Sequence, residues 1–200
     1  MLSADAIVSL HEKATRAWHS TAQGDLQTDG SDWLAAVARQ HRANFDLWHI
    51  EDQARTPGAS DAQIANVKRR VDQTNQLRND LSEELDRFLI DWLQVRSLPN
   101  PEAELHSESP GLIIDRLSIL ALKIYHTREE AERQHAPPGH ADRNRRRLAI
   151  LEEQHRDLST CLGVLWRQTL EGTRRFKLYR QLKMYNDPSL NPAIYLKSHK

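Results

Sequence analysis

The chain has 200 residues, and its 28 lysines and arginines are balanced by 28 aspartates and glutamates. This balance argues against a dedicated nucleic-acid binder or a protein of anionic membrane surfaces, because both classes carry a basic excess. The single cysteine, Cys161, excludes an intramolecular disulfide and a cysteine-rich zinc site.

The first part of the chain is predicted to be helical. Abundant Ala, Leu, Glu, Arg and Gln, with only seven glycines, favour helix throughout. The first helix is expected at 3–20 and the second at 32–56, with a loop at 23–31 between them. Pro57 and Gly58 end the second helix, because proline and glycine are poor helix formers.

The longest helix is expected at about 60–95, since Ser60 can cap it and neither Gly nor Pro interrupts the chain before Pro99. A loop at 97–109 leads to a fourth helix at about 110–135. Its sequence is apolar on every side, which is typical of a helix buried at the centre of a protein.

The rest of the chain is expected to hold a loop at 135–141, a fifth helix at about 142–171 and a shorter sixth at about 173–185. A turn-rich tail follows at 186–200, where prolines, Asn and Asp favour turns. We therefore predict an all-α fold, a bundle of five or six helices that forms a single domain over residues 1–200.

We expect neither a signal peptide nor a membrane-spanning helix in this sequence. No stretch approaches the roughly 20 apolar residues that span a bilayer, and the first thirty residues lack a signal-peptide pattern. We expect a cytoplasmic protein without a membrane span.

The second helix carries polar side chains where its apolar stripe should run. Its segment HRANFDLWHIEDQAR covers residues 41–55. At 100° per residue, one stripe gathers His41, Asn44, Trp48, Asp52 and Arg55. A plain amphipathic helix would place Leu or Ile there, so these side chains are expected to belong to a buried polar cluster.

Two other helices carry matching polar layers. The long helix carries Asn75, Arg78 and Asn79 between apolar turns, and the fourth carries Asp115, Arg116 and Lys123. Buried charges are very costly without partners, so we expect these layers to meet. If the second and third helices form an antiparallel hairpin, His41 faces the layer at 74–79.

The leading hypothesis from these layers is a pocket for a small polar or anionic ligand. The cations expected to hold an anion are Arg55, Arg78, Arg116 and Lys123. Neutral hydrogen bonds are assigned to Asn44, Asn75 and Asn79, and Trp48 is placed against a ligand ring. The tail could add Tyr185 and Asn186 as a lid. For acid–base work the candidate is His41, paired with Asp52 or Asp115; whether a reaction occurs is left open.

Two alternatives stay open. The polar layers can instead form a self-satisfied network that only sets helix register, in a non-catalytic scaffold or a homodimer. A metal-dependent bundle enzyme is the other alternative, in which His41, His126 and His155 are gathered from separate helices. Ligands from separate helices follow no spacing rule, so no metal ligand and no cofactor is assigned.

Four segments together resemble a known family. They are HRANFDLWHIED, LRND, SPGLIIDRLSILALKIYH and KMYNDPSLNP, which lie between about His41 and Tyr195. They are similar to a family of bacterial proteins catalogued as a domain of unknown function. The resemblance implies an all-helical bacterial cytoplasmic protein with a context in cell-envelope glycan metabolism. It supplies no catalytic residues.

Overall fold

The structure is a computed structural model that describes residues 2–20, 32–182 and 189–192. The described residues form five α-helices and one pair of two-residue strands, which confirms the all-α prediction. The helices are α1 (Ala4–Ser20), α2 (Asp32–Gln53), α3 (Asp61–Gln94), α4 (Pro110–Glu132) and α5 (His140–Leu170). The expected loop at 23–31 lies outside the described residues.

Helices α3 and α4 begin where the sequence predicted. Ser60 caps α3 with a capping box, in which its side chain accepts from the backbone N–H of Gln63 and the Gln63 side chain accepts from the Ser60 N–H. Ser109 caps α4, and Pro110 occupies the first turn, where a missing N–H costs nothing.

The sixth helix expected at 173–185 is wrong over its described part, 173–182. Gly172 ends α5 with a φ of 71°, a conformation that favours glycine. The next residues form β2 (Arg174–Arg175), which pairs in parallel with β1 (Glu104–Leu105). Arg174 and Arg175 thus direct their backbone hydrogen bonds to a neighbouring strand instead of to a helical turn. Of the predicted tail at 186–200, only residues 189–192 are described.

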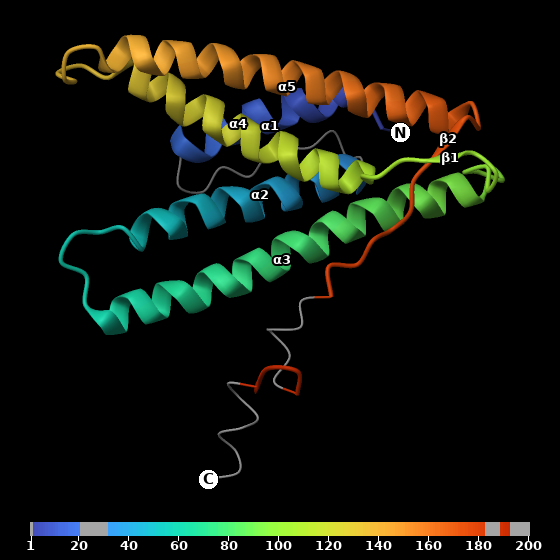
Figure 1. The fold of residues 1–200 in the computed structure, drawn as a ribbon, viewed down its shortest axis with the longest axis horizontal. Coiled ribbons are helices and arrows are strands. Elements are labelled where there is room, and N and C mark those ends of the chain that lie inside the picture. Colours follow the sequence, from blue (N-terminus) through green and yellow to red (C-terminus); the bar gives the residue numbers. More distant parts are fainter. Residues whose placement is uncertain (1, 21–31, 183–188, 193–200) are drawn as a thin grey trace.

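Helix α4 is the centre of the bundle and packs against each of the other four helices. In Figure 1 it runs diagonally between α5 and the hairpin of α2 and α3. Helices α1, α2 and α4 run in one direction, and α3 and α5 in the other. The core around α4 is apolar, and its fully buried residues include Leu85, Leu89, Ile114, Leu117 and Leu162.

The crossing of α3 and α4 is locked at the start of α4. A Cβ on Gly111 would lie 2.3 Å from the Ser82 carbonyl oxygen, so only glycine permits this approach. Asp86 accepts the Gly111 N–H at 2.6 Å and the hydroxyl of Ser109. Burial raises the pKa of Asp86 to about 6. This contact fixes the register in which Asp115 faces α3.

None of the described helices combines the length and the apolar character needed to cross a membrane.

Candidate functional site

A buried polar network joins α2, α3 and α4. Both carboxylate oxygens of Asp115 accept from Arg78, at 3.0 and 2.9 Å. The same carboxylate accepts from the side-chain amides of Gln40 at 2.6 Å and Asn44 at 2.9 Å. Arg78 also donates to Asn75 at 3.4 Å. The carboxylate is therefore compensated by one guanidinium and two amides, as a buried charge requires.

The network continues to His41, which is fully buried. Asn44 donates to the Ser118 hydroxyl at 2.9 Å, and that hydroxyl lies 2.7 Å from Nδ1 of His41. The other ring nitrogen, Nε2, lies 3.1 Å from the His11 carbonyl oxygen and 2.9 Å from the Thr15 hydroxyl. A carbonyl only accepts, so Nε2 carries the proton and Nδ1 accepts from Ser118. Burial lowers the pKa of His41 to about 3.

The geometry predicted for this cluster is correct in part. Asn44, Arg78 and Asp115 meet, as the matching layers predicted. His41 does not face the layer at 74–79, because α1 and Ser118 of α4 occupy both of its nitrogens. Its link to Asp115 passes through Ser118 and Asn44 and is not the direct pair expected for acid–base work.

The far end of α2 takes no part in this network. Asp52 and Arg55 are exposed there, and Arg55 bonds to Glu51 of its own helix. Asp52 therefore does not pair with His41.

Two cations of α4 were wrongly expected to be buried. Arg116 and Lys123 are exposed, and Arg116 pairs with Glu108 at 2.8 Å. Both line a surface groove shared with α5. They lie on the side of α4 away from Asp115, so they cannot join its network.

The other predicted ligand-binding residues are placed as follows. Asn79 is buried, and its amide nitrogen has no hydrogen-bond partner among the described residues. Asn44, Trp48, Arg55 and Arg78 line a cavity of about 430 Å³ between α2, α3 and α4. Tyr185 and Asn186 lie outside the described residues.

A second cluster, which we call the three-histidine cluster, consists of His19 from α1, His49 from α2 and His126 from α4. One ring nitrogen from each could bind a metal ion, and these nitrogens all lie within 4.8 Å of one another. All three side chains are half-buried. Within the described parts of the chain, no other group of histidine, cysteine or acidic residues is close enough to hold a metal.

In each of these rings Nδ1 is already engaged. Nδ1 of His19 donates to the Thr15 carbonyl at 2.7 Å, and Nδ1 of His49 donates to the Phe45 carbonyl at 2.8 Å. Nδ1 of His126 lies 3.0 Å from the carboxylate of Glu129. These partners fix the tautomer, so Nε2 of each ring keeps its lone pair free. For His19 and His126, Nε2 is buried without a hydrogen-bond partner among the described residues.

Aromatic rings surround the three-histidine cluster. Tyr125 stacks on His19 with ring centroids 4.2 Å apart, and Trp48 stacks on His126 at 4.9 Å. Phe45 contacts both His19 and His49. Burial lowers the pKa of His126, an effect that Glu129 opposes. Burial therefore favours the neutral imidazole of His126, the form that binds metals.

The metal alternative from the sequence gathered His41, His126 and His155, and the structure does not bring these three together. His41 has both ring nitrogens bonded, and His155 lies on α5 beside Glu12. His19 was missed altogether. No spacing along α1 marks His19 as a ligand, because its partners come from α2 and α4.

Comparison with known proteins identifies a family. A family model described as "Protein of unknown function (DUF4254)" matches residues 34–178. The matched range includes His49 and His126. It begins after α1, the helix that carries His19. No curated protein and no solved structure matches the chain.

Proposed function

The chain belongs to the DUF4254 family of proteins of unknown function, and we propose that it binds a divalent transition-metal ion through Nε2 of His19, His49 and His126. The observation that carries this proposal is the hydrogen bonding of the three rings. Each has Nδ1 held by a carbonyl or a carboxylate, the arrangement found around metal-binding histidines.

The spacing suits a small contraction on binding. Nitrogens bound to one tetrahedral zinc at about 2.0–2.1 Å lie about 3.3 Å apart. One ring nitrogen from each of the three histidines lies within 4.8 Å of the other two, so small movements of the rings can close the site. Imidazole nitrogens suit zinc, copper, nickel and iron, and disfavour magnesium and calcium, which prefer oxygen ligands.

The number of ligands supports a reactive site over a structural one. Structural zinc sites use four protein ligands, whereas catalytic sites use three and leave a fourth position to water or substrate. Such a metal supplies a Lewis acid and a water that ionises near neutral pH. In this chain, Glu129 orients His126, and the stacked rings of Tyr125 and Trp48 limit the access of bulk water.

The test is metal content. The full chain, carrying no polyhistidine tag, is stripped with EDTA, reloaded with Zn²⁺, desalted and analysed by inductively coupled plasma mass spectrometry. We expect about one zinc per chain. The His49→Ala variant should hold less than a fifth of that amount, because two imidazoles bind zinc far more weakly than three.

The matched control is His135→Asn. His135 is exposed and has a φ of 58°, a conformation that asparagine also adopts. This variant should retain the full zinc content. Equal zinc in wild type, His49→Ala and His135→Asn would contradict the proposal, and so would the absence of stoichiometric zinc from the wild type.

The polar network around His41 and Asp115 supports a different role. Its charges and amides are nearly all paired within the protein, so we infer that it sets the register of α2, α3 and α4. Both arginines that line the cavity beside it are paired, Arg78 with Asp115 and Arg55 with Glu51, so the cavity offers an anion no unpaired guanidinium.

A further inference from the structure

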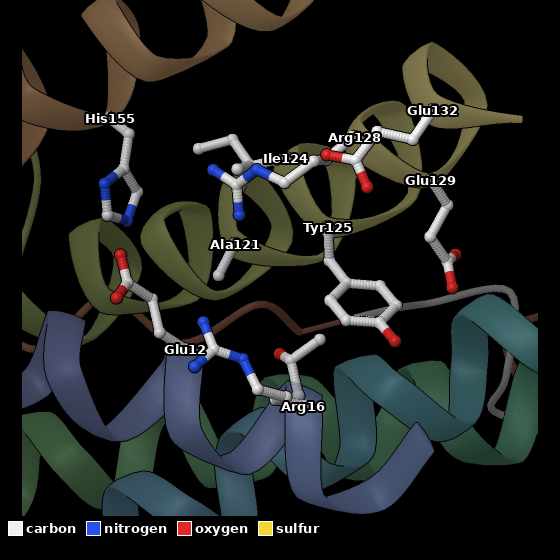
Figure 2. Close-up of a pocket in the computed structure, with 10 residues that line it drawn as sticks. Glu12, Arg16, Ala121, Ile124, Tyr125, Arg128, Glu129, Glu132 and His155 are labelled. Carbon is white, nitrogen blue, oxygen red and sulfur yellow. The ribbon is translucent and has the colours of Figure 1, made fainter. Parts of the chain in front are cut away.

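A cleft lies between α1, α4 and α5, and it is lined by arginines, glutamates and a buried histidine. Its volume is about 250 Å³, and Figure 2 shows its side chains converging from the three helices. Arg16 of α1 faces Tyr125 and Arg128 of α4, His155 of α5 covers one end, and Thr15 also lines the cleft. The cleft borders both assigned sites, since its Thr15 bonds to His41 and its Glu129 bonds to His126, but its arginines and His155 belong to neither site.

Two guanidinium groups enter this cleft from opposite sides. Arg16 rises from α1 and Arg128 descends from α4, toward the space between the helices (Figure 2). Arg128 has one carboxylate partner, Glu152, at 3.0 Å. Arg16 has no ion pair with any described residue, although its charge acts on Tyr125. Two cations brought together in this way are best satisfied by a shared oxyanion, because guanidinium groups bind carboxylates and phosphates through paired N–H donors.

His155 gives an independent sign of a ligand. Its side chain is 7% exposed and lines the cleft. Its Nε2 has no hydrogen-bond partner among the described residues. A buried ring nitrogen without a partner is costly, and a ligand in the cleft would remove that cost. Figure 2 shows the ring directed toward the carboxylate of Glu12 and the inside of the cleft.

The ends of the cleft differ from its middle. Glu12 stands at the end covered by His155, and Glu129 stands beyond Tyr125 at the other end (Figure 2). Carboxylates accept hydrogen bonds from hydroxyl and amino groups. A ligand that matched the cleft would therefore need an oxyanion and hydrogen-bond donors in one small molecule.

We propose that the cleft binds a small organic oxyanion, a phosphate monoester or a carboxylate, whose anionic group lies between Arg16 and Arg128. His155 bonds to the same molecule through Nε2, and hydroxyl or amino groups of the ligand face Glu12 and Glu129. This inference goes beyond metal binding and does not require it. The two sites share a wall, because Tyr125 lines the cleft and stacks on His19.

The test is isothermal titration calorimetry of the full chain in phosphate-free buffer at constant ionic strength. The probes are inorganic phosphate, glucose 6-phosphate, glucuronate and glucose. We expect saturable binding of glucose 6-phosphate or glucuronate, and the stronger of the two identifies the anionic group. Glucose should not bind, since it has no charge for the arginines, and inorganic phosphate should bind more weakly than the organic anion that it resembles.

Variants assign the binding to the cleft. Arg16→Gln should weaken the better probe at least tenfold, and Arg69→Gln, which changes an exposed arginine of α3, should leave it unchanged. His155→Leu should weaken binding severalfold, with recovery in His155→Gln because glutamine restores a polar partner. Circular dichroism shows whether each variant is folded.

The outcome is separable from that of the metal proposal. Binding of the better probe should be unchanged in His49→Ala, which lacks a metal ligand and keeps the whole cleft. Loss of binding in His49→Ala would mean that the anion binds the metal and would overturn the assignment to the cleft. Absence of saturable binding for all three oxyanions, or equal affinity in wild type and Arg16→Gln, would also overturn it.

Discussion

His41 and the three-histidine cluster both lie where α1, α2 and α4 pack together, yet the hydrogen bonding of their rings differs. Both nitrogens of His41 are hydrogen-bonded inside the protein. In the cluster, Nδ1 of His19 and of His126 is held while Nε2 is left without a partner.

The difference separates structure from function. A buried polar group that the protein satisfies itself fixes packing, and a buried polar group that the protein leaves unsatisfied requires an explanation. Helices α1, α2 and α4 run in the same direction, and together they carry both groups of side chains. We call the network around His41 the closed layer, and the three-histidine cluster of His19, His49 and His126 the open layer. The closed layer holds the helices in register for the open layer.

The largest expected effect tests the closed layer. Asp115→Ala leaves Arg78 and two amides without their acceptor, so the free energy of unfolding should fall by about 3–5 kcal/mol. Urea denaturation measures this loss. His49→Ala in metal-free buffer should cost about 1 kcal/mol or less, since it removes a half-buried ring. Similar losses for the two variants would erase the distinction between the layers.

Zinc tests the open layer by mass action. At a free concentration 100 times its dissociation constant, zinc should stabilise the folded protein by about 2.7 kcal/mol. Urea titrations with and without zinc measure this gain in wild type and His49→Ala. A gain of the same size in the variant would place the metal elsewhere in the protein.

Acid should weaken the closed layer. Burial lowers the pKa of His41 from 6.5 to about 3, so the unfolded chain takes up a proton that the folded protein excludes. The stability that His41 contributes is full above pH 6.5 and is lost as the pH falls toward 3, by about 2 kcal/mol between pH 7 and pH 5. Asp86 has the opposite sign, because its pKa is raised to about 6.

The pH effect is isolated by comparing wild type with His41→Gln in metal-free buffer. The difference between their free energies of unfolding should shrink by about 2 kcal/mol from pH 7 to pH 5. A difference independent of pH would contradict this account, because it would show that His41 has the same pKa in the folded and the unfolded protein.

The smallest expected effect concerns the support of the open layer. Glu129→Gln removes the charge that orients His126, and zinc affinity should fall about tenfold, which is about 1.4 kcal/mol. Competition with a chromogenic chelator measures it. Glu132→Gln, which changes an exposed neighbour on α4, should leave the affinity unchanged; an equal loss in both variants would point to a general charge effect.

Much of the fold was predictable because its signals are local. Ser60 and Pro110 mark helix starts, and the long uninterrupted stretch after Ser60 is helical throughout. The sixth helix failed because a strand pairing with Glu104–Leu105 is a non-local contact, which helix propensity does not contain.

The site was harder to predict for the same reason. A helical wheel placed Asn44 on an inward face, and Asn44 does meet Asp115. A helical wheel does not show which neighbouring helix covers each face. The contacts of His41 with α1 were therefore missed, and Arg116 was wrongly predicted to be buried. His19 could not be chosen from sequence, because its partners come from two other helices and follow no spacing rule.

The most direct test of the central claim is a crystal structure of the zinc-loaded full chain, with anomalous diffraction data collected on both sides of the zinc absorption edge. We predict one anomalous peak bonded to Nε2 of His19, His49 and His126 at about 2.0–2.1 Å. A well-ordered structure without a peak there, or with zinc bound only at other residues, would contradict the account.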